Sequence, residues 1–174
     1  MPLVISEPDV NELSRLVSDL GHILHACVLD GASVGYILPF TEEEAEAFWR
    51  DKVLPAVEGG CRIVLVAAMD GEVVGTVQLD YDTPPNQPHR AEVKKLLVHP
   101  KARRNGIARA LMLAIEQRAR DVGRSLLTLD TRSDDAAEPL YESMGYVTAG
   151  RIEGWCRDTL TDRYDATTIM YKAL

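Results

Sequence analysis

The residues of this chain that are best suited to chemistry gather in one basic segment, Arg103-Arg104-Asn105-Gly106-Ile107-Ala108. Apolar spacing predicts that a helix begins at its end. The first N–H groups of a helix have no partner within the helix, and the helix dipole favours negative charge there. A glycine at this point lets a phosphate approach the backbone closely. The segment therefore predicts an anion-binding turn.

Other residues outside this turn have side chains that can exchange protons. Glu92 lies at the beginning of one predicted core strand, Asp130 at the end of another, and Tyr141 in a predicted helix. A carboxylate whose pKa is raised by partial burial can act as a general base. Each residue also has a structural interpretation: Glu92 could pair with a cation, Asp130 could cap a turn, and Tyr141 could be a core aromatic.

The sequence around the turn predicts a strand before it and a helix after it. The strand is apolar and partly β-branched, at Val93, Leu96, Leu97 and Val98. The helix has apolar residues at three- and four-residue spacing, at Ile107, Leu111, Ala114, Ile115, Ala119 and Val122. There is no Gly-Lys-Ser/Thr of a nucleotide P-loop and no three-glycine dinucleotide fingerprint. An ordinary strand–turn–helix with a solvated basic turn is the alternative interpretation.

The rest of the chain alternates between the two periodicities. Helices are expected from about Ser6 or Asp9 to Val28, over 41–57 with a disturbance near Pro55, over 107–122, and over 134–144. Strands are expected over 3–5, 61–69, 72–80, 91–98, 125–130, 146–152 and 167–172, with residues 153–165 irregular. The pattern predicts an α/β (α+β) mixed sheet flanked by helices, with a right-handed parallel crossover through the central helix.

Composition limits the function classes. A chain of 174 residues with 46% hydrophobic residues is expected to form one domain, residues 1–174. Its net charge of −8 argues against a nucleic-acid partner. Positive charge is instead concentrated near the turn, at Lys94, Lys95, Lys101, Arg103, Arg104 and Arg109. This local patch suits a compact polyanion, and the acidic remainder suits a cationic substrate.

The remaining compositional signals concern location and metals. Three widely spaced cysteines predict reduced thiols, and the absence of a signal-peptide pattern or a long apolar run predicts a cytoplasmic protein without a membrane partner. His22 and His25 share a helix face, but no third ligand is apparent, so we assign no metal site.

Two motifs together resemble those of the GNAT superfamily of N-acetyltransferases. Arg103-x-x-Gly106-x-Ala108 is similar to its pyrophosphate loop, and Leu140-Tyr141-Glu142-Ser143-Met144-Gly145-Tyr146 resembles its Leu-Tyr-x-x-x-Gly-Phe/Tyr signature. The resemblance implies a GNAT fold. In that fold a mixed, mostly antiparallel twisted sheet of about six or seven strands is flanked by about four helices. A splayed parallel strand pair holds acetyl-coenzyme A (acetyl-CoA).

The resemblance also implies roles for individual residues. Cofactor binding falls to Leu96, Leu97, Val98, Arg103, Arg104, Asn105, Gly106, Ile107, Ala108 and Arg109. A bulge near Leu96–Val98 would aim a backbone N–H at the thioester oxygen. Glu92 or Asp130 would be the general base, and Tyr141 the general acid beside the sulfur. Substrate contacts are expected from Ser33, Trp155 and Tyr164.

Within the superfamily, four further segments resemble the tabtoxin-resistance acetyltransferases, which inactivate a β-lactam toxin: residues 31–35, 90–93, 129–131 and 154–172. The expected activity is acetyl transfer to a small-molecule amine, such as a toxin or an antibiotic. A protein N-terminal acetyltransferase and a noncatalytic acetyl-CoA-binding module are the alternatives, and a homodimer is left open. Asp134 replaces an asparagine common in the superfamily, so it receives no role.

Overall fold

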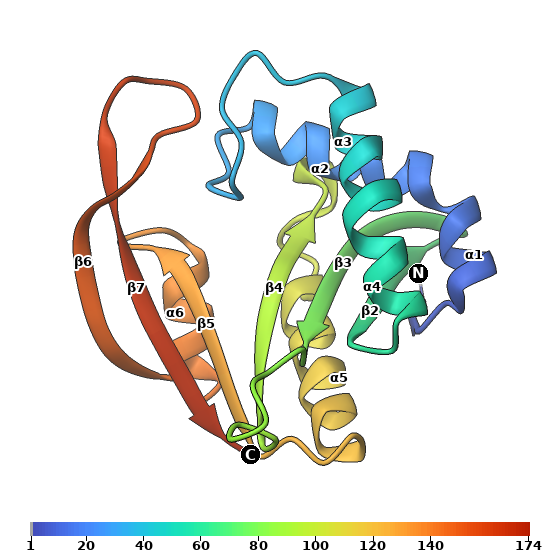
Figure 1. Ribbon diagram of the computed structural model, residues 1–174. Coiled ribbons are helices and arrows are strands. Elements are labelled where there is room, and N and C mark those ends of the chain that lie inside the picture. Colours follow the sequence, from blue (N-terminus) through green and yellow to red (C-terminus); the bar gives the residue numbers. More distant parts are fainter. Residues whose placement is uncertain (1) are drawn as a thin grey trace.

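The computed structural model describes residues 2–174, and its main feature is a seven-stranded mixed sheet with helices on both faces (Figure 1). The strands are β1 Leu3–Ser6, β2 Arg62–Met69, β3 Glu72–Asp80, β4 Arg90–Val98, β5 Leu126–Arg132, β6 Val147–Arg157 and β7 Tyr164–Ala173. Their order in the sheet is β1-β2-β3-β4-β5-β7-β6. Neighbouring strands are antiparallel except for the parallel pair β4–β5.

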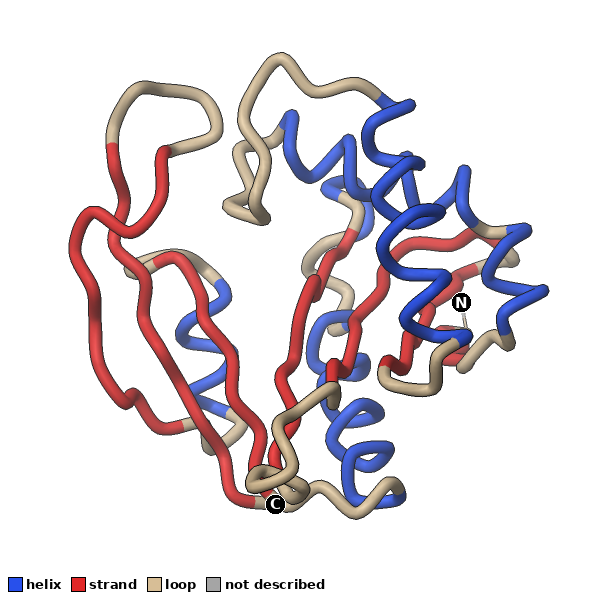
Figure 2. The backbone as a smooth tube through the Cα atoms, viewed as in Figure 1, coloured by secondary structure: helices blue, strands red, loops and turns tan. Residues whose placement is uncertain are grey.

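The parallel pair is joined at only one end. Three residue pairs connect β4 to β5, namely Arg90↔Leu126, Ala91↔Leu127 and Glu92↔Thr128. Both strands continue beyond these pairs, and Figures 1 and 2 show them diverging into a V. The predicted splayed strand pair is therefore present. It leaves the β5-facing edge of β4 without strand partners after Glu92.

The helices are α1 Val10–Arg15, α2 Val17–Leu29, α3 Glu42–Phe48, α4 Leu54–Glu58, α5 Ile107–Asp121 and α6 Ala137–Ser143. They correspond to the four expected helices, two of which are interrupted. A π-helical segment, Trp49–Val53, joins α3 to α4 just before Pro55, which has no N–H to continue the α-helical pattern. Within residues 2–174, no helix is both long and apolar enough to cross a membrane.

Strand alternation separates the two faces of the sheet. Ala91, Val93, Leu127 and Leu129 are buried in the core that contains α5 and α6. The other face of β2 and β3 is covered by α1 to α4, through two clusters that include Leu24 and Trp49. The intervening residues of β4 and β5 therefore face the side on which α2 and α3 lie.

The C-terminal region differs from the sequence-based expectation. The segment expected to be irregular, 153–165, is partly strand, because β6 extends to Arg157 and β7 begins at Tyr164. β6 is an exposed edge strand, so its backbone pairs with β7 without an apolar face. Its sequence therefore lacks the apolar alternation from which a strand is predicted. The helix expected over 134–144 begins only at Ala137, because Asp134 has a left-handed φ of 64°.

Candidate cofactor and acceptor site

The turn before α5 has the geometry of an anion site. Gly106 caps the helix with a φ of 75°, a left-handed conformation that favours glycine, and a Cβ built there would meet no atom within 4 Å. Within residues 2–174, no group accepts a hydrogen bond from the backbone N–H groups of residues 104–109. These donors have no protein partner at a helix N-terminus, so the turn fits the pyrophosphate of a coenzyme A.

The side chains of the turn divide between ligand-facing and structural roles. Arg104 is exposed and makes no hydrogen bond or ion pair within residues 2–174. Arg103 instead contacts Asp30 at the end of α2, with 2.5 Å between Nη1 and Oδ2. Arg109 donates a 2.7 Å hydrogen bond to the Ser143 hydroxyl of α6. Arg104 is therefore the cation most available to a phosphate, while Arg103 and Arg109 join neighbouring elements.

The side chains of three other residues of the turn are taken up by the protein itself. The Asn105 amide donates to the carbonyls of Ala102 and Arg103, which shapes the turn. The Ile107 side chain is buried in the α5 core, and Ala108 is half-buried. For these residues, the N–H groups are the parts that can meet a ligand.

A bulge lies in β4 close to the predicted position. Thr76 pairs with Leu97 and Gln78 pairs with Lys94, so β4 has one residue more than β3 between these two pairs. Lys95, at the bulge, has a φ of 50°, which is unusual for a lysine. Leu96 and Val98 then pack against the α5 core, whereas Leu97 packs in the cluster with α2. The edge that continues along these residues offers backbone groups to an extended ligand.

The two candidate bases lie on one face of the splayed pair. Glu92 pairs with Thr128, and Asp130 follows Thr128 by two residues, so all three side chains point to the side opposite the α5 core. Asp130 is exposed, and its carboxylate accepts a 3.5 Å hydrogen bond from Thr167. The structure therefore places the two carboxylates that the sequence could not rank on the same face, one on each strand.

Glu92 belongs to a charged network at the closed end of the V. Its Oε2 lies 3.4 Å from Lys94 Nζ, and Lys94 in turn lies 3.0 Å from Asp80. Arg62 contacts the same Asp80 oxygen at 2.6 Å. Burial would raise the pKa of Asp80, but hydrogen bonds from Lys94 and the Asp82 amide and the charge of Arg62 outweigh burial and lower it. Glu92 thus has the cation partner that its structural interpretation requires, but it shares that cation with Asp80.

Tyr141 lies in the opposite layer from the two carboxylates. It is only 6% exposed, belongs to the α5 core, and meets the Tyr146 ring edge-to-face with centroids 5.7 Å apart. Its hydroxyl has no hydrogen-bond partner within residues 2–174, yet it is not among the polar atoms that are sealed from solvent. Burial, followed by the charges of Asp130 and Asp135, raises the pKa of Tyr141 well above its ordinary value. The hydroxyl is therefore a largely buried donor without a protein partner, and it stays protonated at neutral pH.

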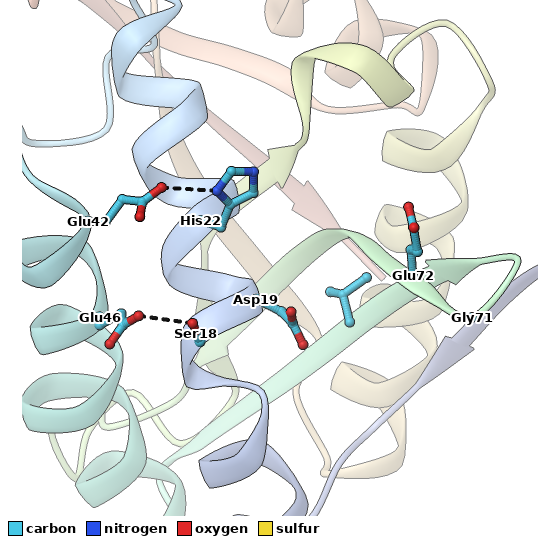
Figure 3. A pocket seen from close by; sticks show the side chains of 8 residues that line it. Ser18, Asp19, His22, Glu42, Glu46, Gly71 and Glu72 are labelled. Carbon is cyan, nitrogen blue, oxygen red and sulfur yellow. Dashed lines mark hydrogen bonds and ion pairs between the residues drawn. The ribbon is translucent and has the colours of Figure 1, made fainter.

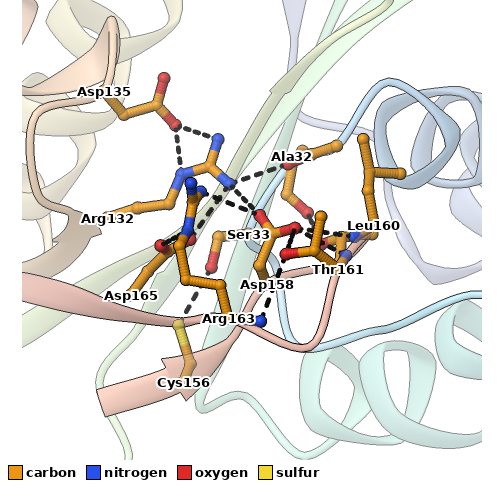
Figure 4. Close-up of polar contacts among 12 residues, drawn as sticks. Ala32, Ser33, Arg132, Asp135, Cys156, Asp158, Leu160, Thr161, Arg163 and Asp165 are labelled. Atoms are coloured by element: carbon orange, nitrogen blue, oxygen red, sulfur yellow. Dashed lines mark hydrogen bonds and ion pairs between the residues drawn. The ribbon is translucent and has the colours of Figure 1, made fainter. Parts of the chain in front are cut away.

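The open end of the V is bridged by two loops (Figure 4). We call the segment 30–40 after α2 the acceptor loop, and the segment 158–163 the β6–β7 loop. Thr159 donates to the carbonyls of Ala32 at 2.9 Å and Tyr36 at 3.3 Å. Leu38 N–H donates to the Thr159 carbonyl at 3.3 Å. These contacts form what we call the roof, which connects the β4 side of the molecule to the β5–β7–β6 side.

Arg132, which is not among the site residues predicted from the sequence, contacts the acceptor loop and the start of the β6–β7 loop. Arg132, at the end of β5, donates to the Gly31 carbonyl at 3.0 Å and contacts Asp135 at 2.9 Å. It also lies 3.4 Å from Asp158, whose other oxygen accepts hydrogen bonds within the β6–β7 loop. Arg132 shares a face with Asp130, so the roof lies next to the candidate base. The pairing of Arg132 with residue 31 has no local sequence signal.

The predicted substrate residues are only partly brought together. Ser33 Oγ lies 3.4 Å from Cys156 Sγ, so the acceptor loop contacts β6 there, and the substrate role of Ser33 stays a prediction. Trp155 is 53% exposed and Tyr164 is 65% exposed. Tyr164 pairs with Arg157, one position along from Cys156↔Asp165, so its side chain points to the opposite side of the sheet from Cys156. The roles of Trp155 and Tyr164 stay predictions without added support.

A separate acidic hollow lies between α2, α3 and the β2–β3 turn (Figure 3). Its lining includes Asp19, His22, Glu42, Glu46 and Glu72, none of them a predicted site residue. His22 lies 3.2 Å from Glu42, while His25 contacts the Phe40 carbonyl. No group of three or more metal-ligating side chains occurs within residues 2–174.

The chain is similar to known N-acetyltransferases. The model of the Acetyltransferase (GNAT) family matches residues 18–146. An uncharacterized N-acetyltransferase from the hisH-hisA intergenic region of Azospirillum brasilense is 34% identical over 123 residues, covering 70% of this chain and 71% of the relative.

Solved structures show the same fold. YncA of Salmonella typhimurium, a putative acetyltransferase solved with its cofactor acetyl-CoA, has a TM-score of 0.76 at 20% identity, with 100% of this chain and 95% of that chain covered. The ribosomal-protein-alanine N-acetyltransferase of Brucella melitensis has a TM-score of 0.76 at 24% identity, with 98% and 99% covered.

Proposed function

Because the chain belongs to the GNAT family of acetyltransferases, we propose that it transfers acetyl from acetyl-CoA to the amine of a small molecule. The roof is the observation that carries the choice of acceptor. Thr159, Leu38 and Arg132 tie the acceptor loop to the β6–β7 side, so an acceptor that extends past the open end of the V would meet these contacts. A small amine need not extend that far.

The turn and the edge of β4 would hold the cofactor. The free N–H groups of residues 104–109 and the Arg104 guanidinium suit a pyrophosphate, and the unpaired edge after Glu92 suits the amides of pantetheine. Acetyl-CoA, when bound, supplies the acetyl group as a thioester. The bulge at Lys95 is the place from which a backbone N–H would polarise the thioester carbonyl.

The chain's own residues would move two protons. Glu92 or Asp130 accepts the proton of the acceptor ammonium, directly or through water, and both lie on the acceptor face. Tyr141 holds a proton at its hydroxyl for the departing thiolate. Its raised pKa makes it a weaker acid than a free phenol. A thiolate in the same poorly solvated place is also a stronger base than in water, so the two pKa values rise together.

A peptide N-terminus is the second candidate acceptor. The fold neighbour from Brucella melitensis is named a ribosomal-protein-alanine N-acetyltransferase, but its 24% identity carries the fold alone. A peptide would need the acceptor loop to withdraw from Thr159 and Arg132. We therefore rank the small amine first.

Further details of the proposal follow from the sequence. Resemblance to the tabtoxin-resistance acetyltransferases makes a β-lactam toxin or an antibiotic amine the first acceptor to test. Cys27, Cys61 and Cys156 are free, as expected for a cytoplasmic protein. A homodimer is supported by the exposed edge strand β6, with Val147 and Ile152 among its exposed apolar residues.

Thiol release from acetyl-CoA tests this function. We would offer matched acceptor pairs, each a small amine and a peptide that presents the same amine at its N-terminus, together with tabtoxinine-type β-lactams, aminoglycosides and polyamines. Acetylated product is confirmed by mass spectrometry. The proposal expects turnover with at least one small amine and a lower kcat/KM for its peptide partner. Turnover with peptides alone would replace the small amine by the peptide, and binding of acetyl-CoA without turnover on any acceptor would indicate a noncatalytic module.

A further inference from the structure

The bulge in β4 turns Lys95 away from the core, which a residue at its position would face in a regular strand. Val93 faces the α5 core, and in a regular strand Lys95 would face it too. The extra residue shifts the alternation, so that Leu96 reaches that core instead. Lys95 consequently contacts the same side of the sheet as Lys94, toward the acceptor loop.

The Lys95 ammonium is held by the acceptor loop and the helix beside it. Its Nζ donates a 2.6 Å hydrogen bond to the Val34 carbonyl and lies 5.5 Å from the centroid of the Phe48 ring and 6.0 Å from that of Tyr36. Gly35 lies next to this ammonium, since a Cβ built on it would be 3.7 Å from Nζ, which is an ordinary contact distance. Glycine is favoured there by its φ of 94°, with which the loop turns beside the ammonium.

This arrangement has costs that require a compensating gain. A left-handed lysine is strained, and burial lowers the pKa of Lys95 because it disfavours the charged form, although the nearby Asp130 charge opposes that effect. One charged hydrogen bond and two ring faces offset the burial of the ammonium. The same contacts join the strand along which the cofactor would lie to the loop that would cover the acceptor.

We propose that Lys95 is a positioning residue that fixes the acceptor loop to the β4 bulge, so that acceptor and thioester are held in register. The proposal rests on the function proposed above, because that function assigns the loop to the acceptor. The Lys95 side chain touches neither reactant in this role. It acts through Val34 and the bulge backbone.

Lys95→Met tests the tether, because it keeps the length of the side chain and the left-handed backbone cost and removes only the ammonium. Lys52→Met, at an exposed lysine of the π-helical segment, is the matched control. Hydrogen exchange measured by mass spectrometry needs neither cofactor nor acceptor. We expect exchange in residues 31–36 to become about tenfold faster in Lys95→Met, with α5 and the control unchanged.

Kinetics then test the consequence. We expect the KM for the amine to rise about tenfold in Lys95→Met, while acetyl-CoA affinity stays within about twofold. Unchanged exchange in residues 31–36 would overturn the tether even if the enzyme acetylates small amines. Faster exchange would also overturn it if the KM for the amine rises by the same factor by which acetyl-CoA affinity falls. That result would mean that the whole site has loosened and not the acceptor loop alone. If Lys95→Met does not fold, Lys95→Gln replaces it, because glutamine keeps an N–H donor without the charge. The test is then the same: a higher KM for the amine at unchanged acetyl-CoA affinity supports the tether, and equal changes overturn it.

Discussion

The turn before α5 and the roof both lie at the open end of the V, but they are held by contacts of different range. The turn is local: Gly106, its N–H donors and α5 lie within one continuous stretch that follows β4. The roof joins residues more than 100 positions apart, such as Thr159 with Ala32 and Arg132 with Gly31, and its contacts are polar. A change in the turn should therefore affect cofactor binding alone, whereas a change in the roof should affect the choice of acceptor.

The largest effect is expected from Glu92→Gln, which keeps the shape of the side chain and removes its basicity. If Glu92 is the general base, kcat falls by roughly 10²–10⁴-fold with little change in acetyl-CoA affinity. Steady-state kinetics near neutral pH measure this, with Asp130→Asn assayed in parallel. A normal rate in Glu92→Gln would move the role to Asp130 or to bulk water.

Gly106→Glu tests the turn. A carboxylate at the open helix N-terminus repels phosphate, and glutamate is disfavoured at a φ of 75°, so acetyl-CoA should bind about 100-fold or more weakly by calorimetry. Gly123→Glu is the matched control, because Gly123 has a φ of 74° at the other end of α5 and equally open space. Equal acetyl-CoA affinity in the parent and Gly106→Glu would remove the turn from the binding site.

Asp80→Asn tests the closed end of the V, where three strands are joined by charge. Removing one partner of this poorly exposed cluster should lower the free energy of unfolding by roughly 3 kcal/mol, measured by urea denaturation. The folded state lowers the pKa of Asp80, so its contribution is present above the ordinary aspartate pKa and is lost as pH falls through the folded value. The gap between parent and variant should therefore shrink in acid, and a gap that widened would contradict this account.

Tyr141→Phe removes only the hydroxyl. We expect kcat to fall about 10–10²-fold, with cofactor binding and thermal stability nearly unchanged. Tyr146→Phe is the control, because Tyr146 packs against the same ring but its hydroxyl is sealed from solvent. If Tyr141→Phe turns over as fast as the parent, the residue is only a packing aromatic.

The difference in contact range also explains which features could be predicted. The strand, the turn and α5 come from local patterns, and the structure contains them as expected. Glu92 and Asp130 lie on the strands expected for them, and their roles stay predictions. Arg132 and Thr159 give no local signal, because their partners are set by how the chain folds back. The end of β6 was missed because an exposed edge strand needs no apolar alternation. The sequence assigns Lys95 only to a basic patch, because the direction of its ammonium depends on the bulge, which the sequence does not place at Lys95.

The central claim, that the roof restricts the acceptor to small amines, is tested most directly by Thr159→Val. Valine keeps the volume but leaves the Ala32 and Tyr36 carbonyls without the hydroxyl donor, which should loosen the roof without touching the turn. The measurement is the ratio of kcat/KM for a small amine to that for the peptide presenting the same amine. We predict a high ratio in the parent that falls several-fold in Thr159→Val, at unchanged acetyl-CoA affinity. A parent ratio below one, or a ratio that the variant leaves unchanged, would contradict it.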